Sequence, residues 1–176
     1  MKIFLINGPY GAGKDTFGEF LFNQFYRISR NRIIHINFAD WVKDVCRRYF
    51  NWDGDKQSEA GRSLLQYIAT DVVRCKLPNY WGDTVSNLLY SLQDEFDVAI
   101  ITDFRFPNEY DCLLKRFSPA DIVTIHIDRQ MPDRETRHHI SENSLNDFVF
   151  DCYIDNNGTL EDLEAAAKQI GEIYAA

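Results

Sequence analysis

The segment with the clearest chemical signature lies near the N-terminus, where residues 7–17 read NGPYGAGKDTF. It contains the pattern G-x-x-x-x-G-K of a phosphate-binding loop, in which backbone N–H groups surround phosphate oxygens and the lysine, here Lys14, reaches the terminal phosphates. The pattern continues with a serine or threonine whose hydroxyl contacts magnesium, but here Asp15 holds that place and Thr16 follows. A carboxylate among phosphates is stabilised by a nearby cation. The loop therefore predicts a nucleotide site in which Asp15 contacts magnesium or a magnesium-bound water, or orients an acceptor phosphate through a cation.

A second set of candidates follows the apolar run of residues 97–103, DVAIITD. Asp103 ends this run, and ligands of open α/β sheets bind at the carboxyl ends of the strands. A carboxylate in that place positions magnesium or the attacking group in phosphoryl transfer. Arg105 is within reach of a phosphate, and Glu109 is expected to accept from a ribose or a base. The alternative, an aspartate that only caps the next turn, stays open.

The third feature is a polar segment at residues 128–143, DRQMPDRETRHHISEN, which carries Arg129, Arg134 and Arg137. Arginine binds phosphate oxygens bidentately and neutralises the charge that spreads over a transferring phosphoryl group. A lid of this kind, about residues 129–146, also keeps water away from the reaction. A solvated basic loop is the alternative.

A fourth group of cations lies in residues 38–45 and 61–74, where Lys43, Arg62 and Arg74 stand out in an acidic chain. We expect helices over about 38–94 to bind the acceptor. Arg62 and Asp71 lie about two and a half turns apart, on roughly opposite helix faces at 3.6 residues per turn. Arg62 and Arg74 need not contact the same ligand. Ordinary surface helices would show the same charges.

Strands and helices that alternate along the whole chain must position these side chains. Short apolar runs predict strands at 2–7, 32–38, 97–103, 121–127 and 152–158. Helical periodicity predicts helices at 14–28, 39–50, 61–77, 81–93, 107–117 and 159–174. The alternation indicates one three-layer α/β/α domain over residues 1–176, with a mainly parallel five-stranded sheet and right-handed crossovers.

Composition narrows the function further. The chain has 176 residues, 45% of them hydrophobic, and a net charge of −8. That acidity argues against a nucleic-acid polymer as ligand, because extended phosphate contacts need clustered lysine and arginine. No apolar run approaches the roughly 20 residues that span a bilayer, and no signal peptide is recognisable. We therefore expect a cytoplasmic protein without a membrane partner.

The order of these motifs resembles the phage-type deoxynucleoside monophosphate kinases, P-loop kinases related to adenylate and thymidylate kinases. The resemblance runs from GPYGAGKDT through FADWVKD, RSLLQYIATDVVR and ITDFRFPNE to HHISE and IDNNGTLEDL. Its most specific pieces are GKDT, D-x-R-x-x-x-E and HISE. Two positions depart from the expected pattern: Ala69 replaces a glycine, and Tyr10 stands where a basic loop residue can occur.

The resemblance implies transfer of the γ-phosphoryl group of ATP to a deoxynucleoside monophosphate with Mg²⁺, in the host cytoplasm for a phage-encoded member; a homodimer is compatible with it. The residues implied in ATP binding are Gly11, Ala12, Gly13, Lys14, Asp15, Thr16, Asn157 and Gly158. Those implied in acceptor binding are Phe38, Lys43, Arg62, Arg74, Trp81, Asp103, Arg105 and Glu109. Those expected to be catalytic are Lys14, Asp15, Arg129, Arg134 and Arg137, and those expected to hold the metal are Asp15 and Asp103.

Two other functions remain open from the sequence. One is another small-molecule kinase on the same scaffold, of the dephospho-coenzyme A or phosphomevalonate kinase type, the latter of which also carries a GKD loop. The other is a nucleotide-binding regulatory module that phosphorylates no acceptor. The arginine-bearing segment and the set of Trp81, Asp103 and Arg105 favour the enzyme.

Overall fold

The computed structural model describes residues 1–55, 58–130 and 143–174. Its core is one sheet of parallel strands in the order β2-β3-β1-β4-β5. The strands are β1 (Lys2–Asn7), β2 (Ile33–His35), β3 (Val98–Ile101), β4 (Ile122–Asp128) and β5 (Cys152–Asp155). The predicted α/β fold with a parallel five-stranded sheet is thereby confirmed.

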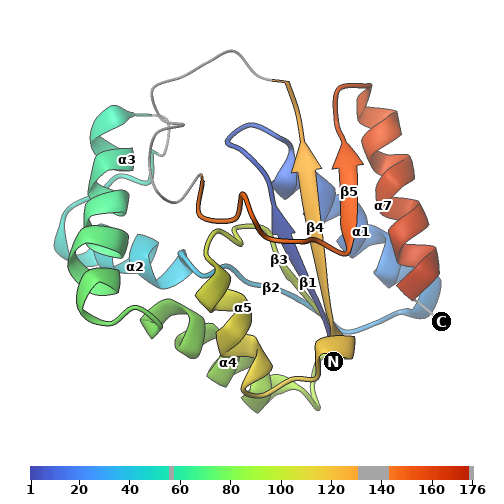
Figure 1. Cartoon of the computed structure of the whole chain (residues 1–176), viewed down its shortest axis with the longest axis horizontal. Helices are drawn as coiled ribbons and strands as arrows, with labels where there is room; N and C mark the ends of the chain where they lie inside the picture. The colour runs from blue at the N-terminus through green and yellow to red at the C-terminus, as the bar shows by residue number, and fades with distance from the viewer. Residues whose placement is uncertain (56–57, 131–142, 175–176) are drawn as a thin grey trace.

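Helices cover both faces of this sheet (Figure 1). They are α1 (Lys14–Ser29), α2 (Asp40–Tyr49), α3 (Glu59–Gln66), the π-helix η1 (Tyr67–Arg74), α4 (Tyr80–Leu92), α5 (Pro107–Leu114), the short 3₁₀ helix η2 (Pro119–Asp121) and α7 (Leu160–Tyr174). Alternation along β1 explains the two layers, because successive side chains of a strand point to opposite faces. Phe4 and Ile6 pack against α1 and α7, whereas Ile3 and Leu5 pack in a second core with α2, α4 and α5.

Two elements differ from their predicted form. The strand expected at 32–38 ends at His35, because Asn37 leaves the ladder and accepts the backbone N–H of Thr102 with its side chain, at 3.0 Å. The helix expected at 61–77 begins at Glu59, capped by Ser58, and continues from Tyr67 as a π-helix. In the described part of the chain, no helix combines the length and the apolar character needed to cross a membrane.

Candidate active site

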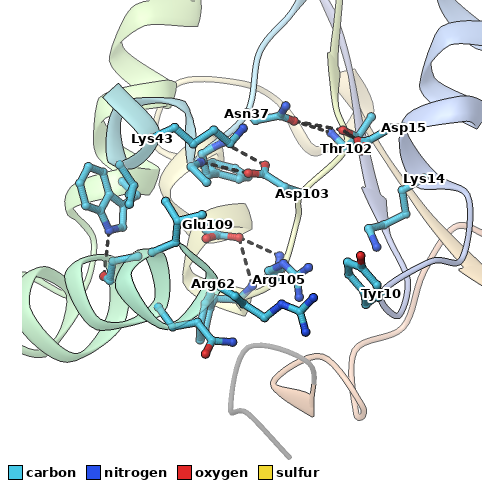
Figure 2. Close-up of a pocket in the computed structure, with 18 of the residues that line it drawn as sticks. Tyr10, Lys14, Asp15, Asn37, Lys43, Arg62, Thr102, Asp103, Arg105 and Glu109 are labelled. Atoms are coloured by element: carbon cyan, nitrogen blue, oxygen red, sulfur yellow. Dashed lines mark hydrogen bonds between the residues drawn. The ribbon is translucent and has the colours of Figure 1, made fainter. Parts of the chain in front are cut away.

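A cavity of about 610 Å³ opens beside the phosphate-binding loop and the residues that follow β3. Most of the predicted site residues line it: Gly11, Gly13, Lys14, Asp15, Thr16, Phe38, Lys43, Arg62, Arg74, Trp81, Asp103, Arg105, Glu109 and Arg129. Figure 2 shows side chains from the loop, from the segment after β2, from the segment after β3 and from α3 around this space. Ten further residues line the cavity without having been predicted as site residues: Tyr10, Asn37, Ala39, Val42, Leu65, Gln66, Ala69, Thr70, Thr102 and Phe106.

The phosphate-binding loop is shaped by glycines in a left-handed backbone conformation. Gly13 has φ = 92° immediately before α1, a region that side-chain-bearing residues rarely adopt. A Cβ at this position would lie 2.6 Å from the amide nitrogen of Asn156. The amide of Asn156 is buried and donates a hydrogen bond to the carbonyl oxygen of Ala12 at 2.8 Å. Asn156 thereby helps to fix the conformation of the loop. The nearby sequence signal was the turn-forming pair Asn156–Asn157, of which only Asn157 was assigned to the site.

Lys14 begins α1 and lies over its own loop. Its Nζ donates to the carbonyl oxygens of Gly8, at 2.7 Å, and Pro9, at 2.8 Å. The same helix N-terminus carries a partial positive charge that favours an anion. A phosphate that enters the loop therefore meets both the lysine and the amides of the first turn.

Three residues assigned to ATP from the sequence do not line the cavity. Ala12 is fully buried in the core and contributes its backbone only. Asn157 accepts the backbone N–H of Gln130 at 2.7 Å and belongs to the turn after β5. A Cβ on Gly158 would meet the carboxylate of Asp162. This turn binds its own neighbours because asparagine and aspartate side chains readily hydrogen-bond local backbone.

Asp103 is engaged by the backbone of the segment that leads into α2. Its Oδ1 accepts the N–H of Phe38 and its Oδ2 the N–H of Ala39, both at 2.9 Å. Burial raises the pKa of Asp103. The hydrogen bond from the N–H of Ala39 and the positive charge of Lys43 lower this pKa, but by less. The carboxylate thus holds the segment that leads into α2 rather than the turn that follows it in the chain.

Replacing Asp103 with asparagine is expected to lower the free energy of unfolding by about 1–2 kcal/mol, the cost of leaving one buried backbone N–H without a partner. An asparagine side chain has one acceptor oxygen, so one of the two N–H groups loses its partner. Urea unfolding of the variant against the parent measures the change. An unaltered midpoint with an unaltered slope would show that these two hydrogen bonds contribute nothing to stability.

The π-helix changes which face Arg74 occupies. In a regular α-helix, the twelve residues from Arg62 to Arg74 place the two side chains about 120° apart. In a π-helix each residue turns through a smaller angle than in an α-helix, at about 4.4 residues per turn. Over the eight residues of η1 the total rotation is therefore roughly 140° less than in an α-helix of the same length. Arg62 and Arg74 therefore line the same cavity. The shared cavity brings the two side chains closer than α-helical geometry predicts, and whether one ligand contacts both stays a prediction.

Arg74 and Glu109, which both line the cavity, form a buried ion pair. Arg74 donates to Oε1 of Glu109 at 2.7 Å, and its guanidinium carbon lies 3.9 Å from the ring centroid of Phe106. Oε2 accepts the backbone N–H groups of Arg105, at 2.9 Å, and Phe106, at 3.1 Å. Burial raises the pKa of Glu109 to about 7, although the charge of Arg74 lowers it. Glu109 thus holds the DFRF turn in place, and protein donors occupy both oxygens that were expected to meet a ribose or base.

Other side chains define the walls and the charge of the cavity. Trp81 is 4% exposed and donates its indole N–H to the carbonyl of Ala69 at 3.1 Å, which places it in the inner wall. The guanidinium of Arg62 lies 4.9 Å from the ring centroid of Tyr10, so the loop touches α3 through a cation–π contact. Lys43 pairs with Asp40 at 2.6 Å.

The segment predicted to form an arginine-bearing lid is described only at its edges. Arg129 lines the cavity, just beyond the end of β4. Arg134 and Arg137, with the adjacent histidines, lie outside the described residues, as does most of the predicted segment 129–146. Their part in the site stays a prediction.

This fold and its phosphate-binding loop are those of P-loop kinases. The APS kinase CysC of Mycobacterium tuberculosis, in complex with AMPPNP and APS, is 12% identical, with a TM-score of 0.57 over 99% of this chain and 98% of that one. A sugar kinase from Janibacter sp. HTCC2649 is 15% identical, with a TM-score of 0.55 over 99% and 96%. At these identities the likeness concerns the fold.

The family model for deoxynucleotide monophosphate kinase matches residues 51–167, more than half of the chain. The chain belongs to this family, and the resemblance drawn from its motifs is confirmed. No curated protein sequence matches it. A nucleotide kinase is the function that family and fold support together.

Proposed function

We propose that the protein transfers the γ-phosphoryl group of ATP to a deoxynucleoside monophosphate in the cytoplasm, with Mg²⁺. The observation that carries this proposal is that one cavity joins the phosphate-binding loop to a wall bearing Arg62, Arg74 and Arg105. A donor phosphate chain and an acceptor phosphate thus have cationic surfaces that face one space. The family model supports the nature of the acceptor.

In this reaction an oxygen of the acceptor phosphate forms a bond to the γ-phosphorus while the bond to the β–γ bridging oxygen breaks, and ADP leaves. The loop amides and Lys14 hold the donor, and Arg62 and Arg105 hold the acceptor in line. Such positioning, with cations against the equatorial oxygens, supplies most of the catalysis of phosphoryl transfer. Arg129 stands at the cavity edge, where it would cover the transferring group.

Magnesium fits this donor set. No group of three or more metal-binding side chains occurs among the described residues, but Mg²⁺ needs only one or two carboxylates, since substrate phosphates and waters complete its shell. Asp15, directly after the loop lysine, would hold the ion, which would neutralise the β- and γ-phosphates. Asp103 was the other expected ligand, and its two oxygens already accept backbone N–H groups.

The test is a panel of the common deoxynucleoside and nucleoside monophosphates, each incubated with ATP and Mg²⁺ and assayed for the diphosphate. We expect at least one deoxynucleoside monophosphate to yield ADP and a diphosphate in equal amounts, and chelation of Mg²⁺ to stop the reaction. Dephospho-coenzyme A and phosphomevalonate are included in the panel. Product from one of these alone would replace the proposal with the small-molecule kinase, and ATP binding without any product would favour the regulatory module.

A further inference from the structure

The usual P-loop site holds magnesium with two side chains of fixed origin. A hydroxyl comes from the serine or threonine after the loop lysine, and a carboxylate comes from the strand beside the loop. In this chain the residue after the lysine is Asp15, and the residue that directly follows β3, next to β1, is Thr102. The hydroxyl of Thr102 donates to Oδ1 of Asp15 at 2.6 Å (Figure 2). A carboxylate and a hydroxyl therefore meet here as in the usual site, but the carboxylate comes from the loop and the hydroxyl from the strand.

We propose that Asp15 and Thr102 are the magnesium-holding pair of this enzyme, with carboxylate and hydroxyl exchanged between loop and strand. Asp15 binds the ion or one of its waters, and Thr102 is a positioning residue that orients the carboxylate. This inference rests on the proposed function, because it assigns the metal site of the same reaction. It explains why a carboxylate stands in the loop at the place of a hydroxyl.

The surroundings of Thr102 fix its orientation. The residue is 1% exposed, and its backbone N–H donates to the side-chain oxygen of Asn37. A Cβ on Gly18 would lie 2.6 Å from the methyl carbon of Thr102, so the glycine leaves the room that the methyl group occupies. Gly18 and Asp15 are three residues apart on α1 and share a helix face. One face of α1 thus receives the methyl group of Thr102 at Gly18 and its hydroxyl at Asp15.

The other carboxylates of the cavity are engaged differently. Both oxygens of Asp103 accept backbone N–H groups, and both oxygens of Glu109 accept protein donors. Across residues 1–55, 58–130 and 143–174, Oδ2 of Asp15 has no hydrogen-bond partner. Asp15 also lines the cavity beside Lys14 and Thr16. This oxygen is the one that the geometry leaves to a cation.

The experiment is a calorimetric titration with ATP, with and without Mg²⁺ and with no acceptor present. Thr102→Val keeps the shape and removes the hydroxyl, whereas the matched control Thr102→Ser keeps the hydroxyl. We expect Thr102→Val to weaken binding of Mg·ATP about tenfold, as for loss of a group that orients a metal ligand, and Thr102→Ser to stay within about threefold. Both should bind magnesium-free ATP like the parent, and thermal unfolding confirms that they are folded.

An exchange of the pair gives a second readout. Asp15→Ser alone should abolish the gain in ATP affinity that Mg²⁺ confers, and Asp15→Ser with Thr102→Asp, which restores the usual arrangement, should recover part of it. The proposal is overturned if Thr102→Val binds Mg·ATP as tightly as the parent, or if Asp103→Asn loses the magnesium effect while Thr102→Val retains it. Neither titration contains an acceptor, so a failed acceptor panel would refute the proposed function without touching these results.

Discussion

Replacement of Lys14 by methionine is expected to lower kcat by about 10²–10³-fold, the usual loss when one preorganised charged donor is removed from a transition state. Methionine keeps the length and apolar stem of the side chain but carries no charge. In the structure Lys14 Nζ donates to the carbonyls of Gly8 and Pro9. We expect phosphate oxygens of a bound nucleotide to take the place of these carbonyls, so that the ammonium group meets the charge that grows during transfer.

Steady-state kinetics with the acceptor identified by the panel measures this loss as kcat and as KM for each substrate. The matched control is Lys115→Met, which removes a lysine paired with Asp83 at 2.7 Å, outside the cavity, and should leave kcat unchanged. If Lys14→Met retained more than about a third of the parent kcat, a difference below 1 kcal/mol in the barrier, the lysine would not act on the transferring group.

The second large effect concerns stability and is expected for Arg74→Met. Its partner Glu109 has a side chain only 2% exposed, and that of Arg74 is 13% exposed. Removing one member of a buried ion pair leaves an uncompensated charge and costs about 3–5 kcal/mol. The guanidinium also packs on Phe106, and methionine retains part of that apolar contact. Most of the loss in unfolding free energy should therefore come from the carboxylate of Glu109, which is left without its cationic partner.

The loss should depend on pH, because burial raises the pKa of Glu109 to about 7. A carboxyl whose folded pKa lies above its unfolded value, 4.5, binds more protons in the folded state between the two values. Its contribution to stability is complete below about pH 4.5 and is lost as the pH rises through about 7. Without Arg74 the pKa of Glu109 rises further, so the variant is expected to lose less stability at pH 5, where Glu109 is protonated, than at pH 8.

Urea unfolding of parent and variant at pH 5 and pH 8 tests this expectation. The double variant Arg74→Met, Glu109→Gln should be more stable at pH 8 than Arg74→Met alone, because it carries no buried charge. Equal losses at both pH values, with no recovery in the double variant, would mean that packing and not charge governs this pair.

Much of the fold was predictable because it depends on local pattern. The strand at 2–7 and the helix that begins at Lys14 match β1 and α1 closely, since an apolar run, a glycine-rich turn and an amphipathic repeat follow one another without ambiguity. The π-helix was not predictable in the same way. The periodicity of residues 61–77 is compatible with an α-helix, and π-helical turns are rare and carry no such local sequence pattern.

The candidate site likewise has parts that were predictable from local sequence and parts that were not. The phosphate-binding loop and the cations around it were recognisable from residue types and spacing, and Lys14, Arg62, Arg74 and Arg105 line the cavity as expected. Thr102 was overlooked although it stands directly before Asp103. The one sequence signal for Thr102 was the missing hydroxyl of the loop. If the loop supplies no serine or threonine after its lysine, a hydroxyl from the adjacent strand is the natural replacement.

The sequence by itself determined the class of the protein: a parallel α/β domain, a phosphate-binding loop at its first strand, and the family to which the motifs belong. Only the tertiary structure decided which carboxylate faces which donor. Asp103 accepts the backbone N–H groups before α2 and Glu109 pairs with Arg74, while Asp15 meets Thr102, a residue 87 positions away. Hydrophobic periodicity and glycine patterns act over a few neighbouring residues, and so they can be read along the chain. The partner of a buried polar group is set by the register of parallel strands and by which helix packs beside them, and these relations appear only once the chain is folded.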